Sequence, residues 1–151
     1  MAKRKKKRER GAGSGSLRDS PALVAAFRLQ ERAAEVGFDW PDANGPVAKV
    51  REELAELEDE IAREEGTAPR SPLPGVEEEV GDLLFAVVNL ARKLHVDPSA
   101  ALKQANDKFT RRFDEVKRLA KARGMQMGRA SLEELDGLWE EAKAGKDGGG
   151  R

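Results

Sequence analysis

The stretch KVREELAELEDEI, residues 49–61, separates apolar and acidic side chains onto two stripes of one helix. At about 100° per residue, one face collects the apolar side chains of Val47, Val50, Leu54, Leu57 and Ile61. A second stripe beside that face carries Lys49, Glu53, Glu56 and Glu60. The pattern predicts an amphipathic helix over about residues 45–65, with carboxylates flanking its buried face.

The stretch VEEEVGDLLFAVVNLARK, residues 76–93, repeats this arrangement. Its apolar face consists of Val76, Val80, Leu83, Leu84, Val87 and Ala91, and Glu79 and Asp82 lie to the same side of it. The loop predicted between the two helices, residues 66–75, contains three prolines and two glycines. Such a short loop predicts antiparallel packing, which can bring Glu53, Glu56, Glu79 and Asp82 to one edge of a bundle.

Four carboxylates that face one volume repel one another, and a hard divalent cation relieves that repulsion. Mg²⁺ and Mn²⁺ prefer oxygen ligands, so the pattern points to one of these metals. The chain has no cysteine and one histidine, which argues against a zinc site. The alternative is a solvated acidic face, on which Lys49 and Glu53 form an ordinary i, i+4 ion pair.

Helical periodicity also extends over the rest of the chain. A first helix is predicted over about 21–36, with Ser20 as N-cap and Pro21 as its first helical residue. Asp97 as cap and Pro98 start another over about 98–123. The capping box Ser131–Glu134 starts a last helix that ends near 144. No segment is convincing as a strand. We therefore predict an all-α fold, an antiparallel bundle of about five helices.

The ends of the chain differ in composition from its middle. Residues 1–10 hold seven Lys or Arg and one Glu, a net charge of +6, so residues 11–151 carry −6. We expect a disordered basic tail and Gly/Ser linker over 1–19, a folded domain over 20–144 and a second disordered tail over 145–151. The basic tail either contacts nucleic acid or is solvated. The absence of cysteine, of a secretory signal and of an eighteen-residue apolar run predicts a cytoplasmic protein without a membrane span.

These motifs resemble those of the MazG family of nucleoside triphosphate pyrophosphohydrolases. The family pattern EExxE, a gap and then ExxD is met by Glu52, Glu53, Glu56, Glu79 and Asp82. The likeness continues through NDKFTRRF, residues 106–113, and covers about residues 20–144. Many family members carry two such domains in tandem, whereas this chain holds one copy, most similar to the C-terminal one. The resemblance implies an all-α fold that is completed by dimerisation, as a homodimer or a larger assembly.

The resemblance also implies an activity and a set of residues. The activity is Mg²⁺-dependent hydrolysis of a nucleoside triphosphate to the monophosphate and pyrophosphate, with Mn²⁺ as a possible substitute. By position, Glu53, Glu56, Glu79 and Asp82 match the metal ligands. Lys108, Arg112, Trp139 and Lys143 match positions that contact the nucleotide, and Lys49 and Asn89 lie beside the metal motifs.

Several of these residues also have a purely structural interpretation. Lys108 and Arg112 can pair with Asp114 or Glu115, and Trp139 lies among leucines typical of a core. Trp40, in the loop GFDWP, can anchor that loop or line a pocket, and the first role is favoured. His95 is expected to interact with carbonyls at a helix C-terminus rather than to act in catalysis.

Two rival functions stay open at the level of sequence. A narrow hydrolase for dUTP or a damaged nucleotide needs the same four carboxylates and differs only in its base pocket. A non-catalytic helical module with a nucleic-acid-binding tail needs none of them, and it predicts salt-sensitive binding without turnover.

Overall fold

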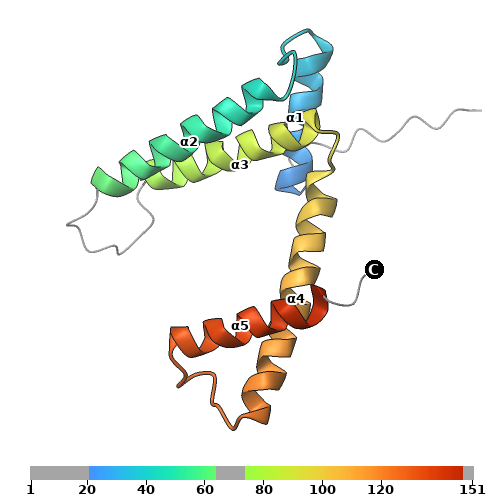
Figure 1. The fold of residues 1–151 in the computed structure, drawn as a ribbon. Helices are drawn as coiled ribbons and strands as arrows, with labels where there is room; N and C mark the ends of the chain where they lie inside the picture. The colour runs from blue at the N-terminus through green and yellow to red at the C-terminus, as the bar shows by residue number, and fades with distance from the viewer. Residues whose placement is uncertain (1–20, 64–73, 148–151) are drawn as a thin grey trace, which may run out of the picture. The chain divides into compact units, whose positions relative to one another are not determined.

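The computed structural model describes residues 21–63 and 74–147, and within these ranges every regular element is an α-helix. The helices are α1 (Ala22–Glu35), α2 (Asn44–Arg63), α3 (Pro74–Lys93), α4 (Pro98–Ala122) and α5 (Leu132–Asp147). The prediction of an all-α, five-helix protein is confirmed (Figure 1). None of the helices in the described part is both long and apolar enough to cross a membrane.

The helix boundaries differ from the predicted ones by a few residues. Pro74 and Gly75 belong to α3 rather than to the loop before it, because proline fits the first position of a helix, where its missing N–H costs nothing. Pro21 is the N-cap of α1 instead of its first helical residue. The last helix continues past 144 to Asp147. Ser20, residues 1–19 and residues 148–151 lie outside the described ranges, as does most of the predicted 66–75 loop.

The chain divides into two compact units between Pro98 and Ser99. In the first unit, α2 and α3 lie antiparallel and side by side, as the short connection between them predicts, and α1 packs on α3 (Figure 1). A buried side chain joins α1 to α3: the Gln30 amide donates from Nε2 to the carbonyl oxygen of Phe85 at 2.8 Å. The fully buried positions of α3 are the small residues Ala86 and Val88.

The second unit consists of α4 and α5. Its core consists of Val116, Leu119, Ala120, Leu138 and Ala142, with Met125, Met127, Leu135 and Trp139 packed against it. The predicted capping box starts α5: Ser131 N–H donates to Glu134 Oε2 at 2.7 Å, and Glu134 N–H donates to Ser131 Oγ at 3.2 Å. This reciprocal pair satisfies backbone donors that a helix start otherwise leaves open.

Three helices end in the same hydrogen-bonded motif. At each end the residue in the left-handed conformation is followed by an N–H that bonds back to a carbonyl five residues earlier, in the pairs Phe38–Ala33, Val96–Ala91 and Met125–Ala120. The left-handed residue is Gly37 after α1 and Gly124 after α4, but it is His95, with φ 57°, after α3. His95 therefore terminates a helix, at a position where glycine fits with less strain.

The apolar faces predicted for α2 and α3 are less buried than expected. Leu54 is 45% exposed and Leu84 is 56% exposed, and Ile61, Val80 and Val87 are also exposed. We call these five residues the apolar stripe. Within the single chain no described element covers these side chains, whereas the resemblance implies a bundle that is completed by dimerisation.

Candidate metal and nucleotide site

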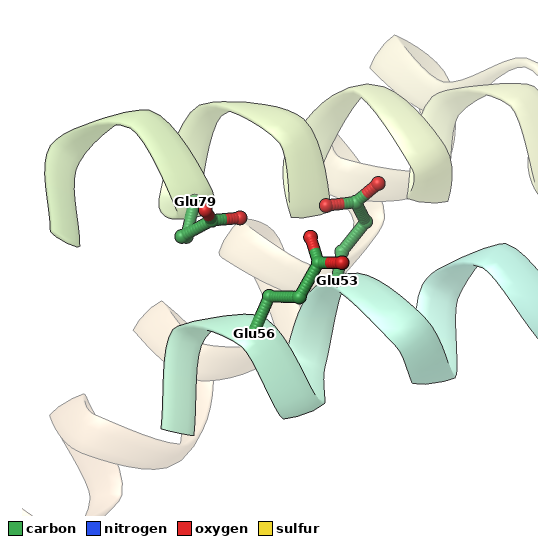
Figure 2. A group of neighbouring side chains, drawn as sticks. All are labelled: Glu53, Glu56 and Glu79. Carbon is green, nitrogen blue, oxygen red and sulfur yellow. The ribbon is translucent and has the colours of Figure 1, made fainter. Parts of the chain in front are cut away.

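Three of the four predicted carboxylates come together between α2 and α3. One oxygen each from Glu53, Glu56 and Glu79 lies within 4.8 Å of the other two. Figure 2 shows Glu53 and Glu56 reaching from α2 and Glu79 from α3, with their carboxylates directed toward one another. Glu53 and Glu56 share a helix face because they are three residues apart, and the antiparallel pairing brings Glu79 opposite them.

Glu79 is the carboxylate of the three whose surroundings most disfavour a negative charge. Its Oε2 is buried and has no hydrogen-bond partner among the described residues. Burial raises the pKa of the Glu79 carboxyl above its ordinary value, and the negative charges of Glu56, Glu53 and Asp82 raise it further. A buried acceptor without a partner, next to two other carboxylates, is the environment that a bound cation would relieve.

Lys49 supplies the only positive charge that the described residues place directly on this group of carboxylates. Its Nζ lies 2.5 Å from Glu53 Oε1 and 2.9 Å from Glu52 Oε1. These two carboxylates, Glu53 first, hold the pKa of Lys49 above its usual range. Glu53 itself is 4% exposed, so the i, i+4 pair that the sequence allowed does exist and one of its members is buried.

Asp82, the fourth predicted carboxylate, is not part of the group of three. It is exposed on α3 and lines a cavity of about 700 Å³, which is also lined by Lys49, Glu53 and Asn89. Glu53 thus belongs both to the three-carboxylate group and to the wall of the cavity. The cavity falls within the size range of about 300–1,000 Å³ that is usual for small-molecule sites.

The amide of Asn89 has a fixed orientation at the cavity wall. Its Oδ1 accepts a hydrogen bond from Nε of Arg92 at 3.0 Å. Since an arginine nitrogen can only donate, the oxygen must face Arg92, and the amide's two N–H donors are left without a partner among the described residues. Asn89, one of the two sequence candidates beside the metal motifs, is therefore oriented as a hydrogen-bond donor.

The remaining candidates belong to the second unit. Lys108 and Arg112 lie one turn apart on α4, where Lys108 is exposed and Arg112 partly buried. Asp114 and Glu115, their alternative partners, accept from Lys117 and Arg118. Trp139 packs on the core and its ring lies 5.3 Å from the ring of Phe109, and Lys143 pairs with Glu140 at 2.5 Å.

Comparison with known proteins identifies the stretch that carries most of these residues. The family profile described as the MazG nucleotide pyrophosphohydrolase domain matches residues 45–117. Residues 45–117 are similar to a MazG domain. The resemblance predicted from the motifs is thereby confirmed, and all four predicted carboxylates lie inside the match. Trp139 and Lys143 lie beyond it.

The chain is also similar to proteins from several bacteria. The chain is 45% identical over 127 residues to the nucleoside triphosphate pyrophosphohydrolase/pyrophosphatase MazG of Thermotoga maritima, covering 84% of this chain and 46% of that protein. It is 45% identical over 126 residues to the nucleoside triphosphate pyrophosphohydrolase of Escherichia coli strain K12, covering 83% and 46%. The uncharacterized protein YabN of Bacillus subtilis is 49% identical over 65 residues, covering 43% and 13%. The chain spans about half the length of the first two.

The carboxylates of the stretch that is similar to a MazG domain fit a hard divalent cation. The upper limit of 4.8 Å between their oxygens is slightly wider than the separation of about 4.2 Å between opposite ligands of one Mg²⁺. Without a metal the three negative charges repel one another, so their oxygens are expected to lie slightly farther apart than the ligands of one bound ion do. All the donors are carboxylate oxygens, which suits Mg²⁺ or Mn²⁺ better than zinc.

Sequence reasoning missed a second cluster in the first unit, around Asp39. This carboxylate pairs with the guanidinium of Arg92, and it accepts from Lys93 Nζ at 3.2 Å. Arg92, followed by Lys93 and the Trp40 N–H, holds the pKa of Asp39 below its ordinary range. No local pattern could have revealed the Asp39–Arg92 pair, because the two residues are 53 positions apart.

Proposed function

We propose that this protein is a Mg²⁺-dependent nucleoside triphosphate pyrophosphohydrolase, which releases a nucleoside monophosphate and pyrophosphate. The observation that carries the proposal is the meeting of Glu53, Glu56 and Glu79, within a stretch similar to a MazG domain, beside a cavity large enough for a nucleotide. The relatives from Thermotoga maritima and Escherichia coli are named nucleoside triphosphate pyrophosphohydrolases.

The four carboxylates of the sequence motif divide their roles by position. Glu53, Glu56 and Glu79 would hold the metal, and Asp82, on the cavity side, would complete its ligands or orient the attacking water. Mg²⁺ or Mn²⁺ bound there would supply Lewis-acid neutralisation of the triphosphate charge.

Cationic side chains would bind the phosphates. Lys49 already lies at the carboxylates, and its flexible ammonium group can exchange Glu53 for a phosphate oxygen when a metal neutralises Glu53. The family resemblance adds Lys108 and Arg112, whose one-turn spacing suits a polyphosphate, together with Trp139 and Lys143. Asn89 would contribute the amide donors described above.

The apolar stripe supports association with a second copy of the chain. Five large aliphatic side chains of α2 and α3 are exposed in the single chain, and large exposed apolar patches mark interaction sites. A homodimer formed through this stripe would bury them in a helical bundle, because an interface between identical copies is self-complementary.

The test is a product assay on the purified protein. Each common NTP and dNTP is incubated with Mg²⁺ or with EDTA, and the products are resolved. Monophosphate plus pyrophosphate, lost with EDTA, is the expected result, whereas diphosphate plus orthophosphate would contradict the proposed bond cleavage. Glu53→Gln should lower kcat/KM by about 100-fold or more, since metal-ion stabilisation amounts to several kcal/mol. Glu58→Gln, an exposed position on the same helix, is the control and should retain activity.

A further inference from the structure

Three charged side chains meet where the loop between α1 and α2 contacts the last turn of α3, and solvent reaches little of them. The side chains of Arg92, Lys93 and Asp39 are 12%, 16% and 23% exposed. Charges that are covered to this extent lose part of their hydration, which is costly unless each group has a defined partner. The cluster therefore differs from an ordinary surface ion pair, whose two partners stay hydrated.

The guanidinium of Arg92 holds two acceptors at once. Its Nη1 donates to Asp39 Oδ2 at 3.2 Å, and its Nη2 pairs with Asp39 Oδ1. Its Nε donates to Asn89 Oδ1 at 3.0 Å. Because the guanidinium is planar, the two-point contact with Asp39 also sets the direction of the Nε–H bond. The position of Asp39 thus determines where the N–H group that holds Asn89 points.

Asp39 is itself fixed by contacts that do not involve Arg92. The Trp40 N–H donates to Asp39 Oδ1 at 2.8 Å, and Lys93 Nζ donates to Asp39 Oδ2 at 3.2 Å. Lys93 also donates to the carbonyl oxygen of Trp40 at 2.7 Å. The indole ring of Trp40 lies on Gly45, where a Cβ would come within 2.3 Å of a ring carbon. The loop is therefore held on α3 and α2 even without the guanidinium.

The amide of Asn89 has no such additional support. Asn89, Asp39 and Arg92 all line the 700 Å³ cavity. Within the described part of the chain, the Nε–H of Arg92 is the group that bonds to this amide. Without that bond the amide is free to rotate by 180° or to move to another rotamer. Rotation would present its oxygen, which repels an anionic ligand, in place of its two N–H donors.

We infer that Arg92, held in turn by Asp39, is a positioning residue that keeps the N–H donors of Asn89 available to a ligand in the cavity. The inference rests on the proposed function for the identity of that ligand, a nucleoside triphosphate. It adds a role for two residues that do not belong to the metal motifs. Arg92 acts through Asn89, so its effect on binding should depend on the presence of the amide.

The test is a double-mutant cycle on the full chain. Arg92→Lys keeps a positive charge beside Asp39 but replaces the planar fork by a single ammonium group, and Asn89→Ala removes the amide. Binding of the α,β-methylene analogues of ATP, GTP, CTP and UTP is measured by calorimetry with Mg²⁺. The bond that the proposed reaction breaks is replaced in these analogues, so binding is measured without turnover. The analogue that binds most tightly is then used for the variants.

Coupling between the two substitutions is the expected result. Arg92→Lys alone should raise Kd by about fivefold, because only a fraction of the rotamers that the amide then samples can donate to the ligand. Asn89→Ala alone should raise Kd by about tenfold, the scale of one lost hydrogen bond. In the Asn89→Ala background, Arg92→Lys should change Kd by less than about twofold. An Arg92→Lys effect of equal size in both backgrounds would show a merely structural role and overturn the inference.

A second variant keeps the test informative if circular dichroism shows that Arg92→Lys is not folded. Asp39→Asn offers the guanidinium one side-chain acceptor in place of two. It should raise Kd by a smaller factor than Arg92→Lys, and this increase should also disappear in the Asn89→Ala background. If the increase persists there, Asp39 does not act through the amide and the inference is wrong.

Arg118→Lys is the matched control. The Nε of Arg118 donates at 2.8 Å to Glu115, three residues earlier on α4. Arg92 makes the same kind of contact with Asn89, three residues earlier on α3. Arg118→Lys should leave Kd unchanged, because no ligand contact depends on Glu115.

The outcomes separate this inference from the proposed function. If the unaltered chain cleaves triphosphates and the cycle shows no coupling in Kd or in kcat/KM, the positioning role is wrong and the hydrolase stands. If an analogue binds with the expected coupling but no triphosphate is cleaved, the positioning role stands and the hydrolase is wrong. If no analogue binds and no triphosphate is cleaved, both are wrong.

Discussion

The ammonium group of Lys49 lies 2.5 Å from a carboxylate oxygen of Glu53, which is the most deeply buried acidic side chain among the described residues. Lys49 also contacts Glu52, which is exposed. Without a metal, Lys49 is the charge that makes burial of Glu53 tolerable. With a metal at the three carboxylates, that role passes to the cation and Lys49 becomes available to a phosphate.

Lys49→Ala should therefore destabilise the metal-free protein more than the metal-bound one. We expect a loss of about 1 kcal/mol in EDTA, limited by the partial exposure of the lysine, and a smaller loss in Mg²⁺. Lys103→Ala is the matched control, because Lys103 and Asp107 form an exposed i, i+4 pair at 2.8 Å. Denaturant unfolding in both buffers measures the difference. An equal loss for Lys49→Ala in EDTA and in Mg²⁺ would contradict this account.

Glu79 predicts how metal-free stability depends on pH. A carboxyl whose folded-state pKa is raised contributes its full stability below its ordinary pKa of 4.5, and this contribution is lost as the pH rises through the raised value. Stability in EDTA should therefore fall as the pH rises above 4.5, and the increase in Tm that Mg²⁺ produces should grow over the same range. Thermal unfolding at a series of pH values, with and without Mg²⁺, measures both effects.

The variant Glu79→Gln tests whether charge repulsion among the three carboxylates destabilises the metal-free protein. The amide carries no charge, so the metal-free variant should be at least as stable as the unaltered chain at neutral pH. It should also lose most of the stabilisation by Mg²⁺ and most of the activity. Glu58→Gln should change none of these. A Glu79→Gln variant that is still stabilised by Mg²⁺ to the full extent would exclude Glu79 as a ligand.

The parts of the structure that follow a local rule were predictable from the sequence. Glu53 and Glu56 are three residues apart on a helix, so their common direction follows from helical periodicity alone. The Ser131–Glu134 capping box is likewise a local pattern, and its two hydrogen bonds are present. To predict that Glu79 lies near Glu53 and Glu56, one further inference was needed, namely the antiparallel pairing of α2 and α3 that a short connection implies. The position of Asp82 could not be predicted in this way, because it depends on the stagger of the two helices, which places Asp82 on the cavity side.

Contacts between distant parts of the chain were not predictable in this way. Gln30 and Phe85 are 55 positions apart, and neither residue type indicates that a buried amide will bond to a carbonyl within a helix. Periodicity shows which face of a helix is apolar but not whether the same chain or another one covers it, so the exposure of the apolar stripe within a single chain was not predictable. Nothing in the sequence indicates that the ring of Trp40 lies against Gly45.

The apolar stripe gives a direct test of self-association. Leu84→Lys places a charge in the middle of the proposed interface and should shift the protein toward the monomer, because an unpaired charge is costly to bury. Val36→Lys, at a position that is 83% exposed and outside the stripe, should leave the mass unchanged. Sedimentation velocity measures the mass of each variant. If Leu84→Lys retains the assembly of the unaltered chain, the stripe is not its interface.

The hydrogen-bonded motifs that end α4 and α3 contain Gly124 and His95, and they give a paired prediction on stability. Both residues have positive φ, 66° and 57°, and in both motifs the next N–H bonds back into the helix. A side chain at this conformation is strained, so Gly124→Ala should cost about 1–2 kcal/mol. His95→Gly should gain about 0.5 kcal/mol, since relief of that strain is partly offset by the greater freedom of glycine in the unfolded chain. Thermal and denaturant unfolding measure both variants. If His95→Gly instead destabilises the protein, the imidazole must make a contact that outweighs the backbone strain, and its role would extend beyond ending α3.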